Sequence, residues 1–221
     1  MFSDISESYD LGNDVLSFGM HRLWKRRFVR MSGPQKGDSV LDVATGTGDI
    51  AAVFAKEVGP EGNVVGVDFS AAMISRARKR GKNVMQNLRF EVGDAMDLRF
   101  ASHSFDVASI SFGIRNVDDP GAGIAEMSRV VKSGGRVAVL EFGQPTGLFG
   151  ALYRFYSSKL LPFVGGLISG NQDAYSYLDR TAATFPCGQK FAELMENNGL
   201  KDVLAKPLLG GAAWIYIGTV K

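Results

Sequence analysis

A glycine-rich loop followed by an acidic residue is the clearest chemical signal in this sequence. The loop reads Asp42-Val-Ala-Thr-Gly46-Thr-Gly48-Asp49, between an apolar run and an amphipathic segment. Glycines at such a turn let backbone N–H groups approach a ligand at the N-terminus of the following helix. Asp68, 20 residues after Gly48, lies where a carboxylate accepts hydrogen bonds from ribose hydroxyls. The pattern predicts a site for an adenosine-containing ligand.

The loop alone does not distinguish two classes of ligand. Its glycines and Ala51 also satisfy the dinucleotide pattern G-x-G-x-x-G/A, so a nicotinamide dinucleotide fits at this step. A rim of acids formed by Asp42, Asp68 and Asp94 suits S-adenosylmethionine better, because that ligand carries a sulfonium and an adenosine but no phosphate. The alternative for Asp49 is a first-turn acid favoured by the helix dipole, and for Asp94 a turn residue.

A second polar group follows a run that is otherwise apolar. The stretch 105–119, FDVASISFGIRNVDD, begins as a buried strand and continues into Arg115 and Asn116. Arginine stays protonated, so Arg115 would stabilise a negative charge that develops on a substrate or hold a water that accepts a proton. Asn116 would orient that water or the substrate oxygen. The alternative for Arg115 is a salt bridge to one of three nearby acids, Asp118, Asp119 or Glu141.

Two N-terminal residues are further candidates for the chemistry. His21 is one of two histidines, and histidine changes its charge near neutral pH, so it suits a base. The alternative for His21 is a structural hydrogen bond within a helix. Tyr9 belongs to a segment that we expect to close over the cofactor as a lid. The other histidine, His103, lies in a polar turn, and we expect it to be exposed.

Alternating strands and helices must position these residues. Short apolar strands are predicted at 39–44, 63–67, 88–92, 105–112 and 136–142. Helices are predicted at 14–31, 49–58, 70–80 and 119–131, with Ser70 as a cap. Strands separated by helices form β-α-β units with right-handed crossovers. The sequence therefore predicts an α/β fold with a doubly wound, mostly parallel sheet that is buried on both faces.

The C-terminal part departs from this alternation. A helix is predicted over 189–198, and two strands over 203–205 and 214–220 follow each other so closely that they pair as an antiparallel hairpin. The segment of about 143–185 is too long for an ordinary connection, so we interpret it as an insertion with a function.

Composition excludes several classes of protein. The 221 residues, 45% of them hydrophobic, suffice for one domain. The net charge is +2 and the basic residues are dispersed, which favours a solvated surface over nucleic-acid binding. The single cysteine, Cys187, excludes an intramolecular disulfide and a multi-cysteine metal site and suits the cytoplasm. We expect no signal peptide and no membrane-spanning helix.

Several motifs together resemble a known enzyme family. DVATGTGD, VVGVDFS, GDA and the hairpin resemble the class I S-adenosylmethionine-dependent methyltransferases. Four longer stretches resemble the family that C-methylates the ring in ubiquinone and menaquinone biosynthesis. They are YDLGNDVLSFGMHRLWKR (9–26), SFGIRNVDD (111–119), LEFGQP (140–145) and YSYLDRTAATFP (175–186). One departure is Thr181-Ala-Ala-Thr184, where this family often has a serine-containing stretch that bears on the substrate wall.

The resemblance implies a fold and a cofactor site. The fold is a seven-stranded sheet with six parallel strands and one antiparallel, within a single methyltransferase domain over 1–221. Residues of about 1–33 would form a helical lid, and about 143–185 the insertion. S-adenosyl-L-methionine would be the cofactor. The contacts carried over by position are Thr47, Asp68 at the ribose, Asp94 and Ala95 near the adenine, and Ser111, beside the loop residues Gly46, Gly48 and Asp42.

The resemblance also implies a reaction and a location. We expect C-methylation of a polyprenylated quinol ring, with demethylmenaquinol as the acceptor and Arg115, Asn116, His21 and Tyr9 as the catalytic residues. The alternatives are the ubiquinone-pathway benzoquinol, O- or N-methylation of another small lipid or phenol, a nicotinamide-dependent oxidoreductase, and a non-catalytic binding subunit. The insertion would hold the prenyl tail or rest on the bilayer; its alternative is a core or dimer contact. We expect a cytoplasmic protein, peripheral at the inner face of the membrane, that needs no metal or nucleic acid; a homodimer is compatible with the sequence, which leaves the oligomeric state open.

Overall fold

Short runs of β-branched and other apolar residues form the strands of one sheet. The computed structural model describes residues 20–81, 85–145, 147, 150 and 184–221. Its strands are β1 (Ser39–Val43), β2 (Asn63–Asp68), β3 (Leu88–Val92), β4 (Phe105–Ser111), β5 (Val131–Phe142), β6 (Leu200–Leu208) and β7 (Ala213–Val220). They form a seven-stranded sheet in the order β3-β2-β1-β4-β5-β7-β6. β7 pairs antiparallel with β5 and with β6, and the other pairs are parallel. The predicted sheet and hairpin are confirmed.

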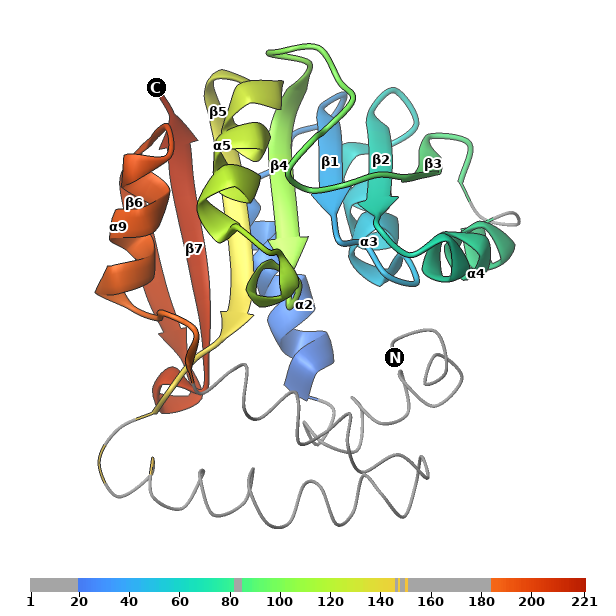
Figure 1. Cartoon of the computed structure of the whole chain (residues 1–221). Coiled ribbons are helices and arrows are strands. Elements are labelled where there is room, and N and C mark those ends of the chain that lie inside the picture. The colour runs from blue at the N-terminus through green and yellow to red at the C-terminus, as the bar shows by residue number, and fades with distance from the viewer. Residues whose placement is uncertain (1–19, 82–84, 146, 148–149, 151–183) are drawn as a thin grey trace.

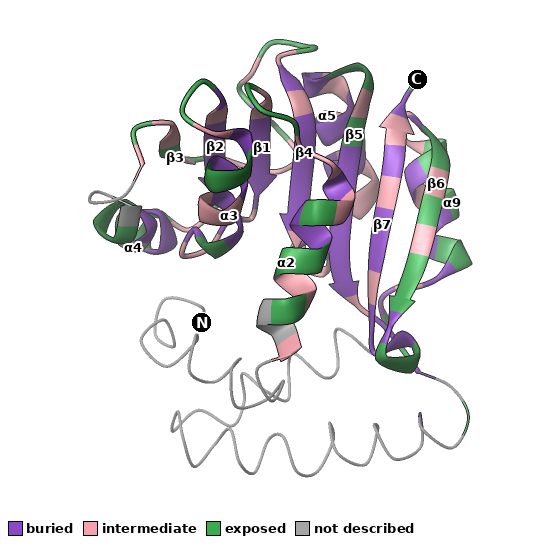
Figure 2. Cartoon of the chain, turned by 180° about the vertical axis from the view of Figure 1, so that it is seen from behind, coloured by how far each residue is buried: buried purple, intermediate pink, exposed green. Residues whose placement is uncertain are grey.

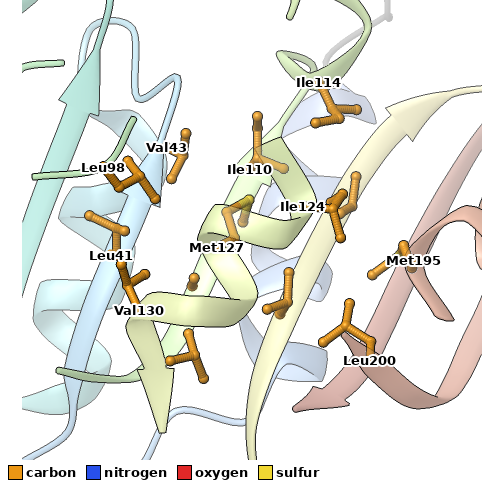
Figure 3. Packing of buried hydrophobic residues seen from close by; sticks show 14 of the residues in the cluster. Leu41, Val43, Leu98, Ile110, Ile114, Ile124, Met127, Val130, Met195 and Leu200 are labelled. Atoms are coloured by element: carbon orange, nitrogen blue, oxygen red, sulfur yellow. The ribbon is translucent and has the colours of Figure 1, made fainter. Parts of the chain in front are cut away.

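Helices cover both faces of the sheet. They are α2 (Met20–Ser32), α3 (Asp49–Val58), α4 (Ala71–Gly81), α5 (Pro120–Val130) and α9 (Gln189–Asn197). α5 and α9 lie on the face seen in Figure 1, and α2 and α3 lie on the face seen in Figure 2. Two apolar layers result, one around Phe28, Phe54 and Ile74 and the other under α5 and α9. In the second layer Met127 and Ile124 of α5 pack against the sheet (Figure 3).

Two strands are longer than the sequence pattern predicts. β5 begins at Val131, not at 136, because Val131 pairs with Phe105 and the register then shifts so that Arg136 pairs with Val107. β6 spans Leu200–Leu208 rather than 203–205. β6 is an edge strand, and an edge tolerates both Pro207 and the charged residues that obscure the apolar alternation.

The parallel strands bring the candidate residues to one edge of the sheet. Asp68 is the last residue of β2 and Ser111 the last of β4. The glycine loop follows β1, and Asp94 follows β3 after one residue. Figure 1 shows the arrowheads of these neighbouring strands pointing the same way. Ligands bind at this carboxyl edge in open α/β sheets, especially where the strand order reverses, as it does between β1 and β4.

Candidate active site

The two glycines of the loop after β1 have different structural roles. Gly48 is the N-cap of α3 with a φ of 85°, and a Cβ there would lie 2.6 Å from the Phe90 ring. Gly46 has a φ of 57°, but a Cβ there would meet nothing within 4 Å. Gly48 is therefore required by packing and backbone conformation, whereas Gly46 leaves open space beside the loop. That space is what a ligand at a helix N-terminus requires.

Asp68 joins the end of β2 to this loop. Its Oδ2 accepts a 2.8 Å hydrogen bond from Gly46 N, and its Oδ1 accepts one of 2.9 Å from Ser70 N. The Ser70 hydroxyl accepts a bond from Met73 N at 3.4 Å, which confirms Ser70 as the cap of α4. Asp68 is half-buried and lies beside the space at Gly46. The carboxylate therefore lies at the carboxyl edge of the sheet, and its contact with a ribose stays a prediction.

Asp94 and Ala95 begin the loop after β3. Asp94 Oδ1 accepts a 2.8 Å bond from Met96 N, and Asp94 also forms an isolated bridge with Asp97. The turn interpretation therefore describes part of what Asp94 does. This hydrogen bond uses one carboxylate oxygen, and both Asp94 and Ala95 are only half-buried. The predicted adenine contact is compatible with this geometry.

Asp42 lies beneath the glycine loop. Its side chain is 1% exposed and accepts bonds from Thr45 Oγ1 at 2.6 Å and from Ser109 Oγ at 2.7 Å. Burial raises the pKa of Asp42 to about 6, against the lowering effect of the two hydroxyl donors. The rim predicted from sequence thus has Asp68 and Asp94 at the sheet edge, whereas Asp42 ties the loop to β4 from below.

Charged residues from three helices meet beside the loop. Arg80 Nη1 of α4 donates to Thr47 Oγ1 at 3.0 Å and pairs with Asp49 Oδ1 at 3.2 Å. Lys25 of α2 pairs with the other oxygen of Asp49 at 3.3 Å. Asp49 is therefore an ion-pair residue as well as a first-turn acid. The predicted cofactor residue Thr47 lies within this network.

The chain turns sharply after β4 and buries Arg115. Phe112 has a φ of 53°, and the short 3-10 helix η1 (Ile114–Asn116) follows. The Arg115 side chain is 3% exposed, and its Nη1 pairs with Glu141 Oε1 at 2.6 Å. Of the three acids considered from sequence, Glu141 is thus the partner. Asn116 is exposed, and its backbone N donates to Gly113 O at 3.0 Å.

The remaining sequence candidates are only partly covered by the structure. The described residues do not include 1–19 of the predicted lid, with Tyr9, or 151–183 of the predicted insertion. His21 lies in α2, but its side chain is not among those described. His103 is exposed, as expected, and its Nδ1 lies 3.2 Å from Val131 O at the opposite end of β5 from Glu141.

Phe69 is a further candidate site residue, which the sequence pattern did not single out. It follows Asp68 directly, and its side chain is 80% exposed. An exposed aromatic ring at this edge of the sheet offers a surface on which a base can stack. The signal was present in VVGVDFS as an aromatic residue immediately after the acid.

Comparison with known proteins identifies the family. The model of the ubiE/COQ5 methyltransferase family matches residues 1–220. The chain belongs to this family. A relative named ubiquinone/menaquinone biosynthesis C-methyltransferase UbiE, from Bdellovibrio bacteriovorus, is 49% identical over 100% of this chain and 94% of its own length. A relative of the same name from Geobacter sp. (strain M21) is 43% identical over 99% of this chain and 94% of its own.

Solved structures show that this ubiE/COQ5 methyltransferase has the class I fold. A SAM-dependent methyltransferase from Thermotoga maritima matches with a TM-score of 0.71 and 21% identity, covering 100% of this chain and 98% of its own. Phosphoethanolamine N-methyltransferase 2 from Haemonchus contortus, solved with S-adenosyl-L-methionine, matches with a TM-score of 0.67 and 18% identity. It covers 90% of this chain and 52% of its own.

The chain is therefore an S-adenosylmethionine-dependent methyltransferase, as the resemblance implied. The described residues fit this cofactor, because Asp68 accepts a hydrogen bond from Gly46 beside the open space and is followed directly by the exposed ring of Phe69. Within the described residues, no group of three His, Cys, Asp or Glu side chains is placed to hold a metal ion. No helix in the described part of the chain is long and apolar enough to cross a membrane.

Proposed function

We propose that this methyltransferase C-methylates the ring of demethylmenaquinol, a polyprenylated naphthoquinol, to give menaquinol. The observation that carries the proposal is the 49% identity, over the whole chain, to a protein named as a C-methyltransferase of ubiquinone and menaquinone biosynthesis. The second candidate acceptor is the benzoquinol of the ubiquinone pathway, because the relatives' name covers both quinones.

The proposed cofactor contacts follow the carboxyl edge of the sheet. Asp68 would accept hydrogen bonds from the ribose hydroxyls, and Phe69 would stack on the adenine. Asp94 and Ala95 would contact the other side of the adenine. Three further contacts proposed from the sequence are Gly46 and Thr47 in the loop after β1, and Ser111 at the end of β4. Gly48 and Asp42 would act by holding the loop in place, since one is packed against Phe90 and the other is buried.

The reaction requires a stronger nucleophile than a neutral phenol provides. Loss of the phenolic proton to water places negative charge on the ring carbon beside the oxygen. Bound S-adenosylmethionine supplies an electrophilic methyl group, which bonds to that carbon while the electrons of the breaking C–S bond remain on sulfur. The ring then regains its aromaticity by losing the proton of the methylated carbon to solvent, and the product phenolate takes up one proton from water to give the quinol. Alignment of the two reactants supplies several kcal/mol.

The side chains after β4 would handle the substrate oxygen. Arg115 is buried at the carboxyl edge, where its guanidinium would stabilise the phenolate or hold the water that accepts the proton. Asn116 is exposed and would orient that water or the oxygen. His21 and Tyr9 remain proposals for the base and the lid.

The acceptor also suggests where the protein works. Because a polyprenyl tail is apolar, we propose that the insertion of about 143–185 binds it and rests on the inner surface of the cytoplasmic membrane. Residues of about 1–33 would close the site as a lid within a single domain, and a homodimer is compatible with this arrangement. No contact with nucleic acid is proposed.

The proposal is tested by identifying the substrate atom, carbon or oxygen, to which the methyl group is transferred. The protein would be incubated with carbon-13 methyl-labelled S-adenosylmethionine and demethylmenaquinol kept reduced, and the lipid product examined by NMR. We expect an aryl C–CH3 resonance. An O–CH3 resonance would instead establish the alternative of O-methylation, and an unlabelled lipid would contradict the proposed acceptor.

A further inference from the structure

Three contacts near the ends of β4 and β5 hold the guanidinium of Arg115 in place. Nη1 donates to Glu141 Oε1 at 2.6 Å and to the Phe112 carbonyl at 2.7 Å. The Cζ atom lies 5.2 Å from the centroid of the Phe142 ring, which supports the plane of the group. These contacts prevent both rotation within the plane and tilting out of it.

Glu141 is itself held in one orientation. It is the penultimate residue of β5, and its side chain is 1% exposed. Its Oε1 also accepts a 2.8 Å bond from Phe142 N, and its Oε2 accepts one of 3.4 Å from the backbone N of Arg115. The carboxylate therefore holds both the backbone and the side chain of Arg115 against β5.

One edge of the guanidinium has no partner among the described residues. The Nε of Arg115 is buried, and no acceptor in the described part of the chain reaches it, although Nη1 has two. A buried donor without an acceptor costs about 1–3 kcal/mol. The Nε–H and one Nη2–H of an arginine lie on the same edge of its plane, and that edge matches the lone pairs of an oxygen or an oxyanion. This donor pair is fixed in place before any ligand binds.

We infer that Glu141 is a positioning residue for methyl transfer, which holds Arg115 so that its Nε–Nη2 edge binds the phenolate oxygen beside the methylated carbon. The inference rests on the proposed function for the identity of that oxygen. Glu141 does not touch the substrate; it occupies Nη1 and thereby determines which edge remains free. A preorganised donor of this kind stabilises charge without reorganising during the reaction.

Substitutions at Glu141 separate positioning from a general effect on folding. Glu141→Ala removes the acceptor of Nη1, and we expect kcat to fall by about 100-fold with little change in the affinity for S-adenosylhomocysteine. Glu141→Gln keeps an acceptor at the Oε1 position, and we expect it to restore kcat to within about tenfold of wild type.

A matched control lies at the other end of the same two strands. Asp106 is the second residue of β4 and pairs with Lys132 of β5 at 2.6 Å. Asp106→Ala also removes an ion pair between these strands, but at the amino edge of the sheet, so we expect kcat to stay near wild type when the protein is folded. An equal loss of kcat in Asp106→Ala and Glu141→Ala would overturn the inference.

A second measurement does not depend on turnover. The probe is 4-nitro-1-naphthol, whose ionisation is followed by absorbance when it is bound to enzyme saturated with S-adenosylhomocysteine. We expect an acid dissociation constant about tenfold larger on wild type and Glu141→Gln than on Glu141→Ala, because a fixed donor edge favours the phenolate. Equal constants on wild type and Glu141→Ala, or no binding to wild type, would overturn the inference. If the probe responds as expected but no quinol is methylated, the proposed acceptor is wrong and the role of Glu141 stands.

Discussion

Ser109 and Asp42 are register partners on the neighbouring strands β4 and β1, and the Ser109 hydroxyl donates a 2.7 Å hydrogen bond to the buried Asp42 carboxylate. Thr45 donates to the other carboxylate oxygen at 2.6 Å, so one acid holds the start of the cofactor loop against the centre of the sheet. Because this acid is completely enclosed, its charge state affects the stability of the whole edge.

The first prediction concerns pH and Asp42. Its folded-state pKa is raised to about 6 by burial, whereas an unfolded aspartate titrates near 3.9. Its contribution to stability is therefore greatest below about pH 4 and is lost as the pH rises through about 6. The side chain of Asp42→Asn stays neutral, so the variant does not share the loss of stability that wild type shows as the pH rises. The free energy of unfolding of the variant, minus that of wild type, should therefore increase by about 2 kcal/mol between pH 4.5 and pH 8.

Urea unfolding across this pH range measures the difference. Asp97→Asn serves as the control for loss of a carboxylate at the surface, because Asp97 is exposed. A flat difference for Asp42→Asn would show that the buried carboxyl is not perturbed as described.

The second prediction concerns the two glycines of the loop. In Gly48→Ala the new Cβ would lie 2.6 Å from the Phe90 ring at a φ of 85°, so the variant should lose about 2–4 kcal/mol of stability. In Gly46→Ala the methyl enters open space, so the loss should be only about 1–2 kcal/mol. S-adenosylhomocysteine should nevertheless bind Gly46→Ala at least about tenfold more weakly, because the methyl occupies the ligand's side of the loop.

Urea unfolding and calorimetric titration of both variants provide the comparison. Unchanged cofactor affinity in folded Gly46→Ala would exclude the open space at Gly46 as the ligand position.

The third prediction separates Asp68 from Phe69. Asp68→Ala removes a charged acceptor and should weaken S-adenosylhomocysteine binding by about 10- to 100-fold. Phe69→Ala removes a ring that is 80% exposed, so stability should change by less than about 0.5 kcal/mol while affinity falls about tenfold. Leu204→Ala, at an apolar side chain that is 52% exposed on β6, should leave the affinity unchanged. If Phe69→Ala binds S-adenosylhomocysteine as tightly as Leu204→Ala does, the proposed stacking of the adenine on Phe69 is wrong.

The fourth prediction concerns Arg115 and Asn116. Both Arg115→Ala and Asn116→Ala should lower kcat strongly while the affinity for S-adenosylhomocysteine stays nearly constant. Arg115→Ala should also lose about 3–5 kcal/mol of stability, because it leaves Glu141 buried without its partner. Asn116→Ala should not, since Asn116 is exposed. A parallel loss of cofactor affinity in Asn116→Ala would place that residue in the cofactor site instead.

The bounds of a strand could be predicted well where both of its faces are buried, and less well for the strand at the edge of the sheet. Val40, Leu41 and Val43 of β1 are buried, so a continuous apolar run marks the strand. Along β6 the charged residues Lys201, Asp202 and Lys206 interrupt the apolar pattern, and only the centre of the strand was predicted.

The site was predictable in position but not in its contacts. The glycine loop, Asp68 and Asp94 each follow a strand, so topology alone brings them to one edge. The partner of Arg115 could not be chosen from sequence, because Glu141 is 26 residues away and meets Arg115 only through the pairing of β4 with β5. The burial of Asp42 likewise depends on Ser109 and Thr45 closing over it.

The choice of acceptor tests the central claim most directly. Methyl transfer from labelled S-adenosylmethionine should be measured with demethylmenaquinol and with the corresponding benzoquinol, each in detergent and each with the same prenyl tail. The account predicts labelled product from demethylmenaquinol, with a kcat/KM at least about tenfold above that for the benzoquinol. A higher kcat/KM for the benzoquinol would contradict the proposed acceptor, and no label in either lipid would contradict quinol methylation altogether.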